Sequence, residues 1–322
     1  MLRRLVLGLL VIVVLVVGGF SIYVASRQNI RVEHASPAIA ASADSAVIAR
    51  GHYLVWSVGP CAGCHGDPAQ HEARDAGAEV PLSGGFTFNI DPGKFHIPNI
   101  TSDLETGIGR IPDSLIARAL RYGVRHDGRV MLPFMEFQGL ADDDLLAIVS
   151  YLRTLPATPH LVPAHEYSTL GKVLNATMFA TPAGPATRPP ASSPRGASVE
   201  NGKYLVENVS LCGSCHTERD AKTGRFTGAQ FTGSTGFVDD FNPKRTWSPP
   251  NITRAPNTGK LGKLSEDEFV TRMRSGRVIP GSPMPWQNFK NMNEDDLRAI
   301  YKFLASVPAT ENEVGPPFVD GK

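Results

Sequence analysis

All four cysteines of this 322-residue chain fall in two pentapeptides of one pattern, Cys61–His65 and Cys212–His216. Each pentapeptide is Cys-x-x-Cys-His, the pattern of a site at which haem is attached covalently. In such a site both thiols add to the vinyl groups of the haem, and the imidazole binds the iron on its proximal side. The pattern therefore predicts two covalently bound haems of the c type. The predicted haem-binding residues are Cys61, Cys64, His65, Cys212, Cys215 and His216.

Other uses of paired cysteines account for less of this pattern. A four-cysteine zinc site would have to join two pairs about 150 residues apart, and it would leave both histidines without a role. A thioredoxin-like redox pair does not require a histidine directly after the second cysteine. Disulfides between the pairs could form in an oxidising compartment. Two matches with no cysteine left over favour haem attachment.

Length and charge set broad limits on the chain. A length of 322 residues predicts about two domains plus connecting segments. The 32 basic and 31 acidic residues nearly cancel, which gives no indication of a nucleic-acid partner. The 31 glycines and 26 prolines indicate many loops. A large, flat, apolar cofactor can replace part of the side-chain core in such loop-rich units.

An uncharged apolar run from Leu5 to Val24 follows Arg3 and Arg4 near the N-terminus. As a helix, a run of about 20 residues spans about 30 Å, the thickness of the hydrocarbon core of a bilayer. Because basic flanks stay in the cytoplasm, the rest of the chain would lie on the periplasmic side of the bacterial inner membrane. The alternative is a cleaved signal peptide and a soluble periplasmic protein. We assign residues 1–30 to this membrane anchor or signal segment.

The two pentapeptides are parts of a longer repeat with an offset of 151 to 153 residues. A short predicted helix leads into each pentapeptide, and it contains Gly51–Val55 in one copy and Gly202–Val206 in the other. Three further features recur, namely a Pro-Asn-Ile-Thr loop, the end of a middle helix and the acidic start of a last helix. They lie at 98–101, 121–123 and 143–145 in the first copy, and at 250–253, 274–276 and 295–297 in the second.

The last helix of each copy has the clearest signal. Apolar residues recur at i, i+3, i+4 and i+7 in both copies, as Leu145, Ile148, Val149 and Leu152, and as Leu297, Ile300, Tyr301 and Leu304. Acidic residues crowd the start of each helix, where the helix dipole favours them. Helices joined by long loops rich in glycine and proline, with no alternating strand pattern, predict an all-α fold.

Between the copies, residues 157–198 are rich in proline and are predicted to be a linker. Within it, Tyr167, Leu170, Val173 and Leu174 have helical spacing. They predict a short amphipathic helix that packs within the chain or on a partner at the membrane. The predicted domains are residues 47–156 and 199–309. The other predicted segments are a linker at 31–46 and a C-terminal tail at 310–322.

The order of these features resembles the class I cytochrome c domain. The doubled arrangement resembles the mono- and dihaem periplasmic cytochromes c, and it is similar to the cytochrome subunits of membrane-bound dehydrogenases. Those subunits typically carry three haems, whereas this chain has two Cys-x-x-Cys-His motifs. The resemblance implies two tandem class I cytochrome c domains, each with loop-rich helices around a covalent haem, plus an N-terminal membrane helix.

The domains of this family bind the iron through a distal methionine as well as the proximal histidine. In the second copy Met284 lies between two prolines, which exclude a helix and would hold the thioether against the iron. Met273 and Met292 belong to the predicted middle and last helices and are better explained as core residues. The predicted metal ligands of the second haem are therefore His216 and Met284.

The first copy offers two methionines, Met131 and Met135. We favour Met135, because a deletion of three residues before the last helix aligns it with Met284. The following residue, Glu136, then stands where the family has proline. His126 is a third candidate, although it is better explained as an exposed loop residue. The predicted metal ligands of the first haem are His65 and Met135, with Met131 as the alternative to Met135.

Other residues near the motifs have weaker signals. Phe95 and Trp247 precede the two Pro-Asn-Ile-Thr loops at equivalent positions, and we expect them near the haem edges. Arg121 and Arg274 could neutralise haem propionates or simply lie on a solvated helix face. The remaining histidines show no ligand pattern and are expected at the surface; they are His34, His52, His71, His96, His160 and His165.

Histidine and methionine together fill both axial positions, and methionine ligation raises the potential of the iron. No position is then open for a substrate, so the pattern predicts an electron-transfer protein and not an enzyme by itself. It would relay single electrons from a dehydrogenase or a quinol-oxidising complex to an acceptor such as a terminal oxidase. The alternative is a haem enzyme with one open haem, such as a dihaem peroxidase or a thiosulfate-oxidising cytochrome.

Overall fold

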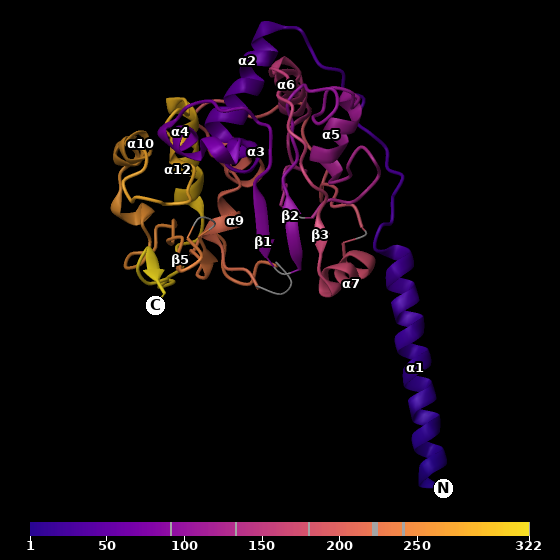
Figure 1. Ribbon diagram of the computed structural model, residues 1–322. Helices are drawn as coiled ribbons and strands as arrows, with labels where there is room; N and C mark the ends of the chain where they lie inside the picture. Colours follow the sequence, from indigo (N-terminus) through magenta and orange to yellow (C-terminus); the bar gives the residue numbers. More distant parts are fainter. Residues whose placement is uncertain (91, 133, 180, 221–224, 240–241, 322) are drawn as a thin grey trace.

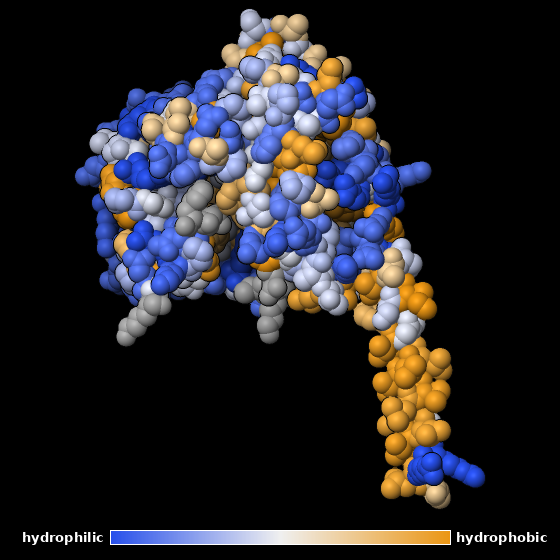
Figure 2. Space-filling view, viewed as in Figure 1, coloured by the Kyte–Doolittle hydropathy of each residue, from blue (hydrophilic) through white to orange (hydrophobic). Residues whose placement is uncertain are grey.

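In the computed structural model, helix α1 (Leu2–Arg27) projects away from the rest of the molecule (Figure 1). The structure describes residues 1–90, 92–132, 134–179, 181–220, 225–239 and 242–321. None of the residues of α1 is buried, and the helix is long and apolar enough to cross a membrane. Figure 2 shows an almost uniformly apolar surface along its length. These properties fit a membrane anchor or a signal peptide.

The first copy of the repeat begins with a helix that leads directly to the first cysteine. Helix α2 (Ser45–Tyr53) is capped by Asp44, whose carboxylate accepts hydrogen bonds from two backbone N–H groups of the first turn. One π-helical turn, η1 (Leu54–Val58), continues it. The other helices of this copy are α3 (Cys61–His65), η2 (Pro68–Gln70), α4 (His71–Ala76), α5 (Asp113–Tyr122) and α6 (Asp142–Thr154).

The second copy follows the same order. Its helices are α8 (Val199–Asn208), α9 (Cys212–His216), η3 (Leu261–Lys263), α10 (Glu266–Arg274), α11 (Trp286–Phe289) and α12 (Glu294–Ser306). The predicted leading, middle and last helices are thus all present in both copies. Figure 1 shows the two copies side by side, the first in indigo to magenta and the second in orange to yellow.

In each copy the leading helix crosses the last helix at a glycine. Helix α2 packs on α6 and helix α8 packs on α12. A methyl group on Gly51 would overlap the carbonyl oxygen of Ala147, and one on Gly202 would overlap that of Ala299. The absence of a side chain therefore lets the two helix backbones meet closely. The glycine that recurs in the sequence repeat marks this crossing.

One hydrophobic core runs through both copies. Buried side chains of η1 and α8, such as Val58 and Leu205, belong to the same cluster. Two hydrogen bonds to backbone carbonyls also cross between the copies. The Ser210 hydroxyl donates to the Val58 oxygen at 3.0 Å, and the Asn288 amide donates to the Trp56 oxygen at 2.8 Å. The two copies are therefore packed against each other through buried contacts.

The expectation of an all-α fold is wrong in one respect, because the described residues, although mainly helical, also form two small antiparallel sheets. The first has the order β1-β2-β3, with β1 (Thr87–Ile90), β2 (Gly93–His96) and β3 (Glu166–Tyr167). The second has the order β4-β5-β6, with β4 (Phe237–Val238), β5 (Arg245–Trp247) and β6 (Phe318–Asp320). Strands of two to four residues are too short to produce a recognisable alternating pattern.

The predicted linker and tail each contribute a strand to these sheets. Strand β3 lies in the predicted linker and pairs Tyr167 with Gly93, while β6 lies in the predicted tail and pairs Phe318 with Trp247. The helix predicted in the linker is also present as α7 (Thr169–Thr177). It packs on α1, and Asn175 of α7 donates a hydrogen bond to the backbone oxygen of Gln28. The amphipathic helix therefore packs within the chain.

Candidate haem-binding sites

The short helix α3 carries the first Cys-x-x-Cys-His motif and ends at its histidine. His65 is 7% exposed, and its Nδ1 lies 2.9 Å from the backbone oxygen of Pro98. Because a carbonyl oxygen can only accept, Nδ1 carries the proton and donates it. The other ring nitrogen, Nε2, then keeps its lone pair for a metal. The Pro98 carbonyl thus selects the tautomer that a proximal ligand requires.

The second motif repeats this arrangement on helix α9. His216 is also 7% exposed, and its Nδ1 lies 2.8 Å from the backbone oxygen of Pro250. Both prolines are the first residues of the Pro-Asn-Ile-Thr loops. Sequence reasoning identified these loops only as repeated segments and missed their role. Their occurrence at nearly the same distance after each motif, 33 residues in the first copy and 34 in the second, was the signal that could have revealed it.

The asparagine of each loop fixes the neighbouring proline carbonyl. Asn99 is almost fully buried, and its amide nitrogen donates to the backbone oxygen of Thr158 at 2.8 Å. Its side-chain oxygen accepts from the backbone nitrogen of Thr101 at 2.9 Å. Asn251 makes the same two kinds of bond in the second copy, with Thr310 and Thr253 as its partners.

Burial sets the protonation of these groups. It lowers the pKa of both His65 and His216, although the hydrogen bond to each proline carbonyl acts in the opposite direction. The imidazoles are therefore neutral at physiological pH, the form that binds metals. Burial also raises the pKa of the Cys61 and Cys212 thiols to about 12, which keeps them protonated.

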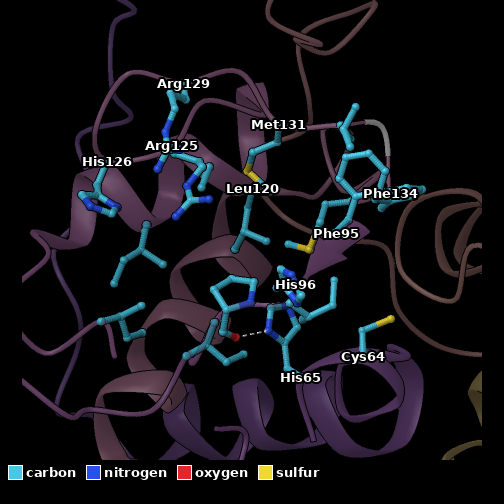
Figure 3. Close-up of a pocket in the computed structure, with 18 of the residues that line it drawn as sticks. Cys64, His65, Phe95, His96, Leu120, Arg125, His126, Arg129, Met131 and Phe134 are labelled. Atoms are coloured by element: carbon cyan, nitrogen blue, oxygen red, sulfur yellow. Dashed lines mark hydrogen bonds between the residues drawn. The ribbon is translucent and has the colours of Figure 1, made fainter. Parts of the chain in front are cut away.

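A cavity of about 330 Å³ lies beside His65. Its walls are mainly apolar and include Leu120 and Phe95, and the two cysteines of the first motif also line it. Figure 3 shows His65 on one side of this cavity and Met131, Arg125 and Arg129 on the other. A neutral imidazole, two thiols and an apolar chamber are the features that a covalent haem requires.

Two arginines give this cavity a positive edge. Arg125 and Arg129 both line it, and burial together with the neighbouring Arg129 lowers the pKa of Arg125. Guanidinium groups remain charged in proteins, so a ligand with negative groups at this edge is favoured. Haem propionates meet that requirement. The residues around the cavity therefore fit a haem in both their donor set and their charge.

The three candidates for the distal ligand of the first haem all line this one cavity. They are His126, Met131 and Met135. His126 is exposed, as expected for a loop residue, whereas Met135 is partly buried and packs against the core. The backbone oxygen of Met135 also accepts a hydrogen bond of 2.9 Å from the Gln138 amide.

In the second copy Met284 is partly buried against the core, in the non-helical segment between α10 and α11. Its backbone oxygen accepts a hydrogen bond of 2.7 Å from the nitrogen of Trp286. Met273 and Met292 are buried in the core, as predicted.

Among the described residues, no three His, Cys, Asp or Glu side chains form a metal-binding group. The two cysteine pairs thus belong to two separate places, on α3 and α9.

Of the two arginines singled out in the sequence, Arg274 is exposed, as the alternative of a solvated helix face predicts, whereas Arg121 meets neither expectation. Arg121 is buried, pairs with Asp142 at 2.7 Å and donates to the backbone oxygens of Gln138 and Leu140. Arg274 donates to the backbone oxygen of Lys290 at 2.5 Å. Both side chains hold the chain segment before the last helix. The arginines that line the cavity, Arg125 and Arg129, follow Arg121 in a loop that has no periodic sequence pattern.

Phe95 lines the cavity as expected and is fully buried in β2. Trp247, its equivalent in β5, is also buried and donates from Nε1 to Asp239 at 2.6 Å. All six of the other histidines are half-buried, and the expectation of surface positions is wrong for His96 and His165, which line the cavity. Burial and the nearby arginines lower the pKa of His165 to about 4, so it is neutral.

Comparisons with known proteins agree with this geometry. Residues 199–308 match the Cytochrome c family. The chain is 30% identical to the cytochrome c subunit of a quinone alcohol dehydrogenase from Gluconobacter oxydans, over 84% of this chain and 56% of the relative. It is 27% identical to the fructose dehydrogenase cytochrome subunit of Gluconobacter japonicus, over 87% of this chain and 56% of the relative.

A protein named as a diheme cytochrome c-type from Cereibacter sphaeroides is 28% identical, over 81% of this chain and 86% of its own length. The chain spans a little over half the length of the two dehydrogenase subunits. The predicted resemblance is confirmed: residues 199–308 match the Cytochrome c family, and the chain is similar to cytochrome c subunits of dehydrogenases and to a diheme cytochrome c.

Proposed function

We propose that this chain is a dihaem c-type cytochrome that relays single electrons on the periplasmic side of the bacterial inner membrane. The observation that carries the proposal is the repeated pairing of a buried motif histidine with a proline carbonyl. His65 pairs with Pro98 and His216 with Pro250, at 2.9 Å and 2.8 Å. Two neutral imidazoles behind two Cys-x-x-Cys-His motifs support two haems, one in each copy.

The protein would hold each haem through two thioethers and two axial ligands. His65 with Met135, and His216 with Met284, are the proposed axial pairs. Bound haem supplies reversible one-electron chemistry at iron. A methionine ligand would favour the reduced iron, and the proline carbonyl would make the imidazole a stronger ligand. Arg125 and Arg129 would pair with the propionates of the first haem.

With a histidine and a methionine of the chain both bound to it, each iron would have no position for substrate or oxygen, which would suit electron transfer and not catalysis. The relatives are cytochrome subunits of dehydrogenases, so a dehydrogenase is the proposed electron donor. A quinol-oxidising complex is a second possible donor, and the acceptor would be a downstream oxidase. Helix α1 would anchor the chain in the membrane beside these partners.

The haem content and ligation of the purified protein test the proposal. We expect two covalent haems per chain, as measured by the alkaline pyridine spectrum and a polypeptide assay. The oxidised protein should show the weak long-wavelength band of a methionine–iron bond. This band should fall in part in Met135→Ala and in part in Met284→Ala, while the control Met131→Ala keeps it.

Binding of carbon monoxide to the reduced native protein would contradict the proposal, because it would reveal an open iron. That result would favour the alternative of a haem enzyme. One haem per chain would also contradict it. Loss of the band in Met131→Ala, with the band intact in Met135→Ala, would transfer the first distal ligand to Met131.

A further inference from the structure

The residue that follows Met135 contacts the haem-attachment motif of the other copy. The carboxylate of Glu136 accepts a hydrogen bond of 2.6 Å from the hydroxyl of Ser214. Ser214 lies between Cys212 and Cys215, inside the second Cys-x-x-Cys-His motif. A single side-chain contact thus joins the loop of a proposed distal ligand in the first copy to helix α9 in the second.

An arginine completes this contact. Arg219 Nη2 lies 3.0 Å from one carboxylate oxygen of Glu136 and 3.2 Å from the other, and it donates to the Ser214 hydroxyl at 3.2 Å. The Glu136 side chain is 32% exposed and that of Arg219 is 26% exposed, so water screens the pair only partly. The guanidinium also lies 4.0 Å from the centre of the Phe226 ring, which restrains its position.

The loop that carries Met135 is therefore held from two sides. On one side the backbone oxygen of Met135 accepts a hydrogen bond from the Gln138 amide, within the first copy. On the other side Glu136 is bound by Ser214 and Arg219 of the second copy. Three hydrogen bonds to one carboxylate, two of them from a cation, are stronger than neutral ones and fix its direction. A residue whose side chain has no hydrogen-bond acceptor could not form this contact.

We propose that Glu136 is a positioning residue for the first haem site. It fixes the Met135 loop against the second attachment motif, and the ligation of the first iron consequently depends on the second copy. The proposal rests on the proposed function, because it takes Met135 as the distal ligand. It adds that the two haem sites are mechanically linked through Glu136, Ser214 and Arg219.

The test uses the full-length holoprotein in a Met284→Ala background, where the remaining methionine–iron band belongs to the first haem. Glu136→Ala should lose most of this band and shift the midpoint potential of the first haem to lower values. Glu136→Gln can still accept from Ser214, and it should restore part of both signals. Ser214→Ala should cause a smaller loss of the same kind.

The matched control is Arg277→Gln. Arg277 forms a similar ion pair between the copies, with Asp75 at 2.8 Å, and its side chain also bonds Gln287. This variant should keep the band and the potential of the first haem. An unchanged band and potential in Glu136→Ala would overturn the inference. So would an equal loss in Arg277→Gln, because any ion pair between the copies would then have the same effect.

Failure of the inference can be distinguished from failure of the proposed function. If the protein without any substitution carries two haems and shows the methionine band, the function stands whatever Glu136→Ala does. If it carries one haem or binds carbon monoxide when reduced, the proposed function fails before any Glu136 variant is compared.

Discussion

The phenol of Tyr204 donates a hydrogen bond of 2.8 Å to the carboxylate of Asp144 in the other copy of the repeat. The reverse contact also exists, because Tyr53 donates to Asp296 at 2.7 Å. Each tyrosine also accepts from the backbone nitrogen of the N-cap residue of the opposite last helix. The leading helix of each copy therefore caps the last helix of the other, in an approximately two-fold arrangement.

These contacts predict that the two copies stabilise each other. Tyr204→Phe and Tyr53→Phe each remove a donor from a buried carboxylate, and we expect each to lower the free energy of unfolding by about 1–3 kcal/mol. Denaturant unfolding of the holoprotein measures this. Tyr301→Phe is the control, because its hydroxyl donates to the Leu264 carbonyl within one copy, and it should cost less. Equal losses in all three variants would refute the prediction.

The lowered pKa of Asp144 predicts that the protein loses stability in acid. Burial acts to raise its pKa, but the guanidinium of Arg50, bonded at 2.8 Å and 2.9 Å, acts with Tyr204 and Arg195 to hold the pKa below its usual value. A carboxyl with a lowered pKa in the folded state stabilises the protein above its unfolded pKa, about 3.9. That contribution disappears as the pH falls through the folded pKa.

The denaturant midpoint should therefore decrease below about pH 4. In Asp144→Asn, which is less stable at neutral pH, the decrease should be shallower because this group no longer titrates. Denaturant unfolding of the native protein and of Asp144→Asn tests this difference. It is measured from neutral pH down to the lowest pH at which the protein still binds haem. Parallel curves for the two proteins would show that other carboxyl groups account for the acid sensitivity.

The asparagine of the second Pro-Asn-Ile-Thr loop provides a prediction about haem binding. Asn251→Ala removes the bonds to Thr310 and Thr253, and we expect a loss of about 1–3 kcal/mol and a lower haem content. The haem stoichiometry and the denaturant midpoint are the measurements. Asn257→Ala lies nearby at an exposed position and bonds Glu311, so it serves as the control. A normal haem content in Asn251→Ala would mean that the loop does not need this anchor.

The helix crossings predict that two glycines resist substitution. Gly202→Ala and Gly51→Ala place a methyl group against a backbone carbonyl, and we expect each to cost about 1–3 kcal/mol or more. Thermal unfolding should show the decrease. Gly63→Ala is the control, because an added methyl group there meets nothing within 4 Å. Wild-type stability in Gly202→Ala would contradict the close approach of α8 and α12.

The site itself was only partly accessible from the sequence. The cysteine motifs predicted His65 and His216 as the proximal ligands, and the prolines around Met284 indicated a methionine in a rigid loop. The proline carbonyls that orient the imidazoles, the arginines at the cavity edge and the two cavity histidines required the structure. The positions of these groups depend on how loops without a periodic pattern fold in the tertiary structure.

Local patterns in the sequence were sufficient to predict the apolar helix, the repeated helices and the linker helix, because neighbouring residues determine helical spacing and helix ends. The addition of β3 and β6 to the two sheets, the exchange of Tyr53 and Tyr204 between the copies, and the bond from Ser214 to Glu136 were decided only by the tertiary structure. Each joins residues that are far apart in the chain, up to 243 positions for Tyr53 and Asp296. Such pairs form only when the whole chain has folded, and no local pattern records them.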